Sequence, residues 1–163
     1  MHPLVTEAMK KAAVVWVTVA DGRPYPLWCL WHEDALYVVS GPGEQAAPGL
    51  DTATEALVTG RGDNGGRVVS WPARVTRLAP DSELWRQVVP QLANKRLNLP
   101  AAEDTGARWA AECVVSRLEP AADPVEAGDT LPRGSLAAPP PPTPAARRTV
   151  KPFRLHRVRK PPR

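Results

Sequence analysis

Residues 17–31 read VTVADGRPYPLWCLW, and this stretch decides the fold. Three interpretations of it are open at first sight. The apolar run that ends at Ala20 can be the last part of an export signal, the stretch can be an ordinary β-hairpin around Asp21 and Gly22, or it can be the opening hairpin of a barrel. The sequence on either side has to choose among them.

The segment before this stretch imitates a signal peptide, because Lys10 and Lys11 precede the apolar run AAVVWVTVA. That run is short, rich in β-branched residues and followed at once by strand-like sequence, which argues against export. The two cysteines, Cys29 and Cys113, lie in apolar contexts without a CxxC motif, which is typical of reduced, buried thiols. We therefore expect a cytoplasmic protein. No stretch reaches the roughly 20 apolar residues that a membrane helix requires.

The first half of the chain predicts a short helix and a three-stranded meander. Amphipathic spacing favours a helix over residues 3–11, and the run around Trp16 is dense in residues that prefer strands. A second strand follows the two prolines of GRPYP, which suit a turn or a sheet edge but not a central strand. Glu33 and Asp34 form a tight turn into a third strand that ends at Ser40 and Gly41.

The second half predicts a hairpin, one substantial helix and a last strand. Residues 55–80 turn at Asp-Asn-Gly-Gly, whose residues favour positive φ. A helix follows, with Asp81 or Ser82 as its N-cap, Pro90 kinking its middle, and apolar residues at helical spacing: Leu84, Trp85, Val88, Leu92 and Leu97. Residues 107–120 predict a sixth strand with Trp109, Ala111, Cys113 and Val115 on one face. The fold class is therefore mostly β: a six-stranded antiparallel barrel with one main helix.

The composition changes after about Pro120. Of the 20 prolines, 11 lie in the last 44 residues, and residues 133–163 hold 9 Lys and Arg residues and no acid. Residues 1–132 hold 12 Lys and Arg residues against 17 acidic ones, a net charge of −5. We expect a barrel domain over residues 1–120 and a disordered, proline-rich, basic tail over residues 121–163.

Sequence motifs exclude several classes of enzyme. No GxSxG, GxGxxG or Walker-type loop is present, which leaves hydrolase, Rossmann and P-loop interpretations without support. The three histidines, His2, His32 and His156, are too dispersed to suggest a metal site. No residue pattern specifies an acid, a base or a nucleophile.

The order of the predicted elements resembles that of the pyridoxamine 5′-phosphate oxidase-like, flavin-binding split β-barrel family. The resemblance covers roughly residues 5–119 and is one of pattern and order. It is carried by the segment WPARVTRL at 71–78 and by Thr18, Asp21, Gly22, Pro24, Pro26, Trp28, Asp34, Leu36 and Tyr37.

This resemblance implies a homodimer that holds FMN, or in some branches a deazaflavin or haem, at the subunit interface over strands two to four. In many members the loop after strand three carries Arg or Lys residues that neutralise the cofactor phosphate. Here that loop, residues 41–50, reads GPGEQAAPGL and contains one acid and no base. Because a phosphate dianion needs charge-assisted donors, we expect FMN binding to be weak.

The candidate cofactor-binding residues follow from the resemblance. Arg61 and Arg74 can substitute for the missing cation, or they are solvated arginines at strand ends. Trp28 can stack on a flavin ring, or it serves the core or a dimer surface. The other candidates are Ser40 and Gly41 at the end of the third strand, and Lys95 and Arg96 at the end of the helix, where they also complement its dipole.

Two functions remain open on the sequence. One is an oxidoreductase in which a flavin transfers hydride or electrons and the protein supplies hydrogen bonds and orientation. The other is a non-enzymatic barrel whose basic tail binds nucleic acid or another polyanion. The segment at 147–163, RRTVKPFRLHRVRKPPR, carries 8 Lys and Arg residues and suits such a partner.

Overall fold

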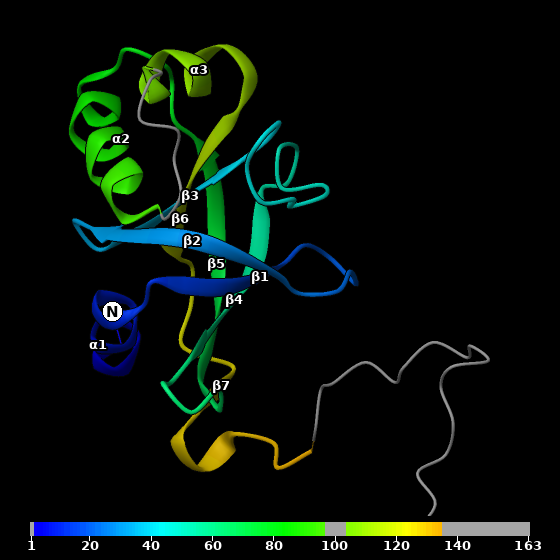
Figure 1. The fold of residues 1–163 in the computed structure, drawn as a ribbon. Coiled ribbons are helices and arrows are strands. Elements are labelled where there is room, and N and C mark those ends of the chain that lie inside the picture. The colour runs from blue at the N-terminus through cyan, green and yellow to red at the C-terminus, as the bar shows by residue number, and fades with distance from the viewer. Residues whose placement is uncertain (1, 97–103, 135–163) are drawn as a thin grey trace, which may run out of the picture. The chain divides into compact units, whose positions relative to one another are not determined.

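The computed structural model describes residues 2–96 and 104–134 (Figure 1). The chain divides into two units, Met1–Pro132 and Arg133–Arg163. The first unit extends beyond the boundary expected at Pro120, while the basic segment from residue 135 onward and the expected helix position Leu97 lie outside the described residues. The elements are α1 (Pro3–Lys11), β1 (Val14–Thr18), β2 (Tyr25–His32), β3 (Ala35–Ser40), β4 (Glu55–Arg61), β5 (Arg67–Arg77), α2 (Glu83–Lys95), α3 (Thr105–Glu112), β6 (Val114–Pro120), β7 (Glu126–Ala127) and a 3-10 turn (Gly128–Thr130).

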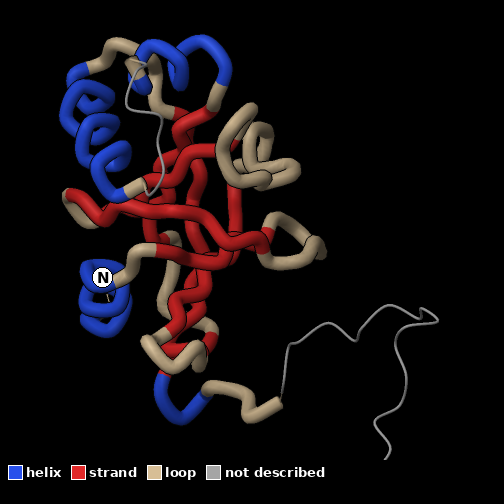
Figure 2. Tube along the Cα trace, in the orientation of Figure 1, coloured by secondary structure: helices blue, strands red, loops and turns tan. Residues whose placement is uncertain are grey.

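Six of the strands close into an antiparallel barrel. Their order is β4-β1-β2-β3-β6-β5, and a further pairing of β4 with β5 closes the ring. Figure 2 shows these strands crossing at the centre of the first unit, with the helices outside them. The predicted fold class, a mostly β, six-stranded antiparallel barrel, is confirmed.

The turns have the predicted chemistry. Glu33 and Asp34 both adopt positive φ, 44° and 58°, between the paired residues His32 and Ala35. Two positive φ angles in a two-residue connection are the signature of a type I′ turn, whose twist matches that of the strands. The β4–β5 hairpin turns through Gly65, with φ of 75°.

Strands β2 and β3 separate toward one end of the barrel. Between them the pairing begins only at Cys29, whereas β2 pairs with β1 from Tyr25 to Trp28. Pro26 therefore lies in a strand that is paired on one side at that point, so its missing N–H breaks no ladder with β3. The gap between β2 and β3 is where the loop after β3 enters.

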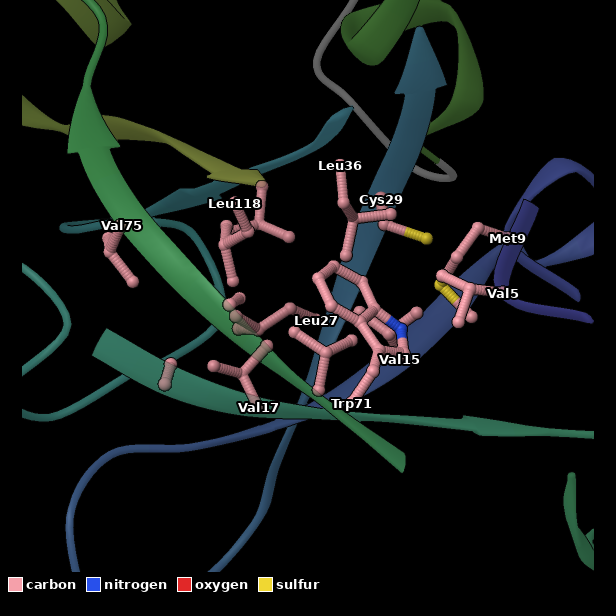
Figure 3. Packing of buried hydrophobic residues seen from close by; sticks show 14 of the residues in the cluster. Val5, Met9, Val15, Val17, Leu27, Cys29, Leu36, Trp71, Val75 and Leu118 are labelled. Carbon is pink, nitrogen blue, oxygen red and sulfur yellow. The ribbon is translucent and has the colours of Figure 1, made fainter. Parts of the chain in front are cut away.

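Two apolar cores lie on the two faces of the sheet. The first fills the barrel interior, where Trp71 lies at the centre and Val5 and Met9 of α1 close one side (Figure 3). The second lies outside the barrel, where α2 and α3 pack on β2, β3 and β6 around Tyr37 and Trp109. The helices therefore cover only one part of the outer sheet surface.

The prediction of a strand over the whole of residues 107–120 is wrong in its first half. Residues 105–112 form the helix α3, and the strand begins at Val114. Asp104 caps this helix by accepting a hydrogen bond from the Ala107 N–H (3.1 Å), and the alanine-rich sequence favours a helix. The alternation of Trp109, Ala111 and Cys113 suggested a strand, but Trp109 lies in the helix and its side chain is buried there.

The main helix is confirmed, with Ser82 as its N-cap and Pro90 inside it. No helix in residues 2–96 or 104–134 is long and apolar enough to cross a membrane.

Candidate functional site

The loop after β3, residues 41–50, is the structural centre of the candidate site. It starts at Gly41, whose φ is 145° and where a Cβ atom would lie only 2.9 Å from the Cα of Cys113. This close backbone approach brings the loop against the start of β6 and the end of α3. Only glycine fits there without displacing the chain.

Glu44, the single acid of this loop, is buried in a cradle of three donors. Its carboxylate accepts hydrogen bonds from Arg96 Nε (2.6 Å), Arg108 Nη2 (2.5 Å) and Trp109 Nε1 (2.9 Å). The Glu44 side chain is 1% exposed, against 17% for Arg96 and 19% for Arg108. Arg108 also donates to the Pro42 carbonyl (3.1 Å) and Arg96 to the Gly43 carbonyl (3.2 Å).

The electrostatics of this cradle keep Glu44 ionised. Burial by itself raises the pKa of Glu44, but the hydrogen bonds from Arg96, Arg108 and Trp109 outweigh it and hold the pKa below its ordinary value of 4.5. In the sequence, Glu44 argued against binding of an anion at this loop. In the structure, its charge is compensated by residues that lie about 50 to 65 positions later in the chain.

The rest of the loop closes the gap between β2 and β3. The Trp28 N–H, at the point where β2 leaves β3, donates to Gln45 Oε1 (2.6 Å). Leu50 is fully buried in the interior core, and Ala47 packs against the same core. Together with the contacts of Glu44, these contacts hold the loop at four residues.

A groove of about 430 Å³ runs beside this loop. Its volume lies within the range of small-molecule sites. Three of its lining residues are acidic, and Glu44 is the one that the cradle compensates. The groove is lined by Ser40, Gly41, Glu44, Ala46, Ala47, Pro48, Asp51, Glu112 and Val114.

The structure brings four of the seven candidate residues to this loop. Ser40 and Gly41 line the groove, Trp28 binds the loop through its backbone, and Arg96 binds Glu44. The assignment of these residues to a cofactor stays a prediction.

The other three candidates lie elsewhere. Arg61, at the far end of β4, stacks over Trp16 with its guanidinium carbon 4.2 Å from the ring centre. Arg74 is exposed on β5, opposite Glu55 on β4 and Glu119 on β6. Lys95 is exposed in the last turn of α2.

Sequence reasoning missed Arg108 and Trp109, which contact Glu44 from α3. The signal that could have found them is the cap residue Asp104, which starts a helix and places both side chains on the turn facing the loop.

Comparison with known proteins identifies the fold. No family model matches the sequence, and no curated protein does. The haem storage protein HutZ of Vibrio cholerae is similar over 75% of this chain and 91% of its own, at 16% identity and a TM-score of 0.53. A candidate pyridoxamine 5′-phosphate oxidase of Listeria innocua is similar over 74% and 94%, at 14% identity and a TM-score of 0.52.

The flavocytochrome Anf3 of Azotobacter vinelandii is similar over 96% of this chain and 87% of its own, at 13% identity and a TM-score of 0.50. The chain therefore has the split-barrel fold of the pyridoxamine 5′-phosphate oxidase-like proteins, as the sequence pattern indicated. At these identities the likeness concerns the fold.

Proposed function

We propose that the protein is a cytoplasmic, homodimeric split-barrel oxidoreductase that binds a flavin of the FMN type with modest affinity. The observation that carries this proposal is the groove beside the loop after β3, which Ser40, Gly41 and Glu44 line on a barrel whose fold is similar to that of a flavocytochrome and a haem storage protein. When bound, such a cofactor supplies hydride or electron transfer.

The lining of the groove holds three acids and no base, so it fits a flavin phosphate poorly. Arg96 and Arg108, whose guanidinium groups suit phosphate oxygens, are not part of the lining. Glu44 already engages both, and Asp51 and Glu112 on the groove wall oppose a second anion. Trp28, whose side chain is half-buried on β2, is the candidate for stacking on the ring system. We therefore expect micromolar binding, and a deazaflavin or haem remains an alternative occupant.

A flavin titration tests the proposal. The fluorescence of FMN should change as the protein is added, with a dissociation constant of about 1 to 100 µM. Arg108→Gln should weaken FMN binding by roughly tenfold to a hundredfold, because it removes a charged hydrogen bond of about 1.5 to 3 kcal/mol, and should change riboflavin binding little. Arg61→Gln is the matched control at the far end of β4 and should change neither.

No binding of FMN, deazaflavin or haem at about 100 µM would overturn the oxidoreductase proposal. It would favour the second candidate, a non-enzymatic barrel whose basic segment at 133–163 binds a polyanion. The observation that favours this candidate is that an internal carboxylate already holds both arginines.

The homodimer would use the part of the sheet that α2 and α3 leave open. The outer face of β1, β4 and the first half of β2 carries half-buried Val14, Trp16, Trp28 and Leu57. An apolar sheet face of this kind is typical of an association surface.

Light scattering at micromolar concentration should therefore give twice the 17.6 kDa mass of one chain. Leu57→Glu should convert the protein to monomers, because each copy would bury a carboxylate in an apolar contact. Thr76→Glu, an exposed change on β5 opposite Arg117, should leave the dimer intact. A monomer mass for the unaltered protein would contradict the assembly.

A further inference from the structure

A second groove lies between α1 and the β4–β5 hairpin. Its volume of about 370 Å³ is within the range of small-molecule sites, and it shares no lining residue with the groove beside the loop after β3. One wall is apolar, because α1 and its C-cap present Leu4, Ala8 and Ala12 at a spacing of four residues. The helix can lie close to β4 because Gly60 faces it: a Cβ atom there would be 2.7 Å from Met9 Cε.

The opposite wall contains a β-bulge. Gly60 pairs with Val69, but Arg61 pairs with Arg67. Val68 is therefore the extra residue of β5, and it lines the groove together with Arg61. Bulges of this kind are over-represented next to functional sites, where they redirect a side chain.

Two charged side chains of this wall, Arg61 and Asp63, make no hydrogen bond or ion pair within the described part of the chain. The guanidinium of Arg61 is held over the Trp16 ring, with its carbon 4.2 Å from the ring centre, and its N–H donors stay available. The other two charges of the groove compensate each other, since Lys11 and Glu7 of α1 form an ion pair of 2.9 Å.

Arg61 and Asp63 are presented by a turn of fixed shape. The Gly62 N–H between them donates to the Gly66 carbonyl (2.9 Å), and the Gly62 carbonyl accepts from the Gly65 N–H (2.8 Å). The pKa of Lys11 is raised by its hydrogen bond to Glu7 and, to a smaller extent, by the charge of Asp63, so Asp63 lies near α1. The groove therefore offers a cation and an anion from one hairpin beside an apolar helix face.

We propose that this groove binds the zwitterion of an amino acid with an aliphatic side chain, its carboxylate on Arg61, its ammonium group on Asp63 and its side chain against α1. A simple anion would face the uncompensated charge of Asp63, and a simple cation would face that of Arg61, whereas a zwitterion complements both. The apolar side chain loses contact with water against Leu4, Ala8 and Val68. This proposal does not rest on the flavin function.

Nuclear magnetic resonance of the isotope-labelled full chain tests the proposal with L-leucine as the probe. The backbone amide of Gly62 and the Nε–H of Arg61 should shift saturably, with a dissociation constant of about 0.1 to 1 mM, as expected of a small ligand at an exposed site. The Nε–H of Arg86, which is exposed on α2, is the internal reference and should not shift.

Three analogues remove one part of the ligand each. Isocaproate lacks the ammonium group of leucine, isoamylamine lacks its carboxylate, and glycine lacks its side chain. Each should bind at least about fivefold more weakly than leucine, because each loses one charged contact or the apolar contact.

Matched variants assign the two charges to their residues. In Asp63→Asn, leucine should bind no more tightly than isocaproate, and in Arg61→Gln no more tightly than isoamylamine. Both changes are at exposed positions of the hairpin, so the fold should persist. Ala8→Leu should block the groove without changing its charge, and Arg86→Gln should leave leucine binding unchanged.

No saturable shift of Gly62 at about 10 mM leucine would overturn the site. Binding of isocaproate or isoamylamine as tight as that of leucine to the unaltered protein would overturn the zwitterion. Leucine binding that survives both Asp63→Asn and Arg61→Gln would place the ligand elsewhere and contradict the proposal. The flavin titration is unaffected by any of these results, because its groove shares no residue with this one.

Discussion

Trp71→Ala should cost about 3 to 5 kcal/mol of unfolding free energy, which is the usual range for removing a large aromatic side chain from a packed core. Trp71 is fully buried at the centre of the barrel interior (Figure 3). It also meets the Trp31 ring edge to face, with ring centres 6.4 Å apart and planes at 85°. No neighbouring element can fill the space, because the strands that surround it are joined in a closed ring.

The indole of Trp71 makes a second variant informative. Its Nε1 atom is buried and has no hydrogen-bond partner among the described residues. A buried donor without a partner costs about 1 to 3 kcal/mol. Trp71→Phe keeps most of the apolar contact and removes this donor, so it should cost less than about 1.5 kcal/mol.

Urea denaturation at neutral pH measures both effects, and the melting temperature of Trp71→Ala should fall by roughly 10 to 20 °C for a domain of this size. Equal losses for the two variants would mean that the N–H is bound, for instance by a buried water. A loss below about 1 kcal/mol for Trp71→Ala would mean that the interior is not closely packed around this residue.

The turns, strands and main helix of the barrel could be predicted from the sequence because they depend on local sequence patterns. The Glu33–Asp34 turn, the hairpin at Gly65 and the capped helix from Ser82 each depend on residues next to one another in the chain. Alternating burial along β1 and β4 follows the same local rule. The pair β4–β5 is also a hairpin, but the pairs β1–β4, β3–β6 and β5–β6 join strands that are distant in the chain, and only the resemblance in element order indicated them.

The candidate site could be predicted less well, because the secondary structure of one segment was predicted wrongly. Trp109, Ala111 and Cys113 alternate as in a strand, but Asp104 starts a helix there, and tertiary burial of Trp109 agrees with the helix. With residues 107–112 taken as part of a strand, Arg108 had no reason to lie beside the loop at 41–50. The compensation of Glu44 therefore could not be foreseen.

Net charge along the sequence was also a poor guide to this loop. The loop contains one acid and no base, which argued against tight binding of a cofactor phosphate. In the structure its acid is buried between Arg96, the C-cap residue of α2, and Arg108 of α3. Charges separated by more than 50 residues are brought within hydrogen-bonding distance only by the packing of α2 and α3 on the barrel, and no spacing rule encodes that packing.

Glu44→Ala should destabilise the protein by about 3 to 5 kcal/mol at neutral pH, as expected when one partner of a buried ion pair is removed. The alanine removes the carboxylate that compensates the charges of Arg96 and Arg108. It also removes one of the contacts that hold the loop, and leaves those of Gln45 and Leu50. Chemical denaturation with the unaltered protein alongside measures the loss.

The same difference should depend on pH in one direction. Because the folded-state pKa of Glu44 lies below its ordinary value of 4.5, its carboxylate stabilises the fold fully above that pH. This contribution is lost as the pH falls through the lowered folded-state pKa, because the Glu44 carboxylate of the folded protein then becomes protonated. The stability curves of the unaltered protein and Glu44→Ala should therefore converge in acid, and curves that stay parallel from neutral to acidic pH would contradict the role of the ionised carboxylate.

A combined variant tests whether the ion pairs of Glu44 or the packing of its side chain hold the loop on the barrel. Replacing a buried ionic cluster by apolar residues of similar volume is often neutral or stabilising, because the desolvation cost of the charges disappears with them. Glu44→Leu together with Arg96→Met and Arg108→Met should therefore recover most of the stability that Glu44→Ala loses. If the triple variant is as unstable as Glu44→Ala, the hydrogen bonds of the arginines to the Pro42 and Gly43 carbonyls, and not the ion pairs, hold this loop on the barrel.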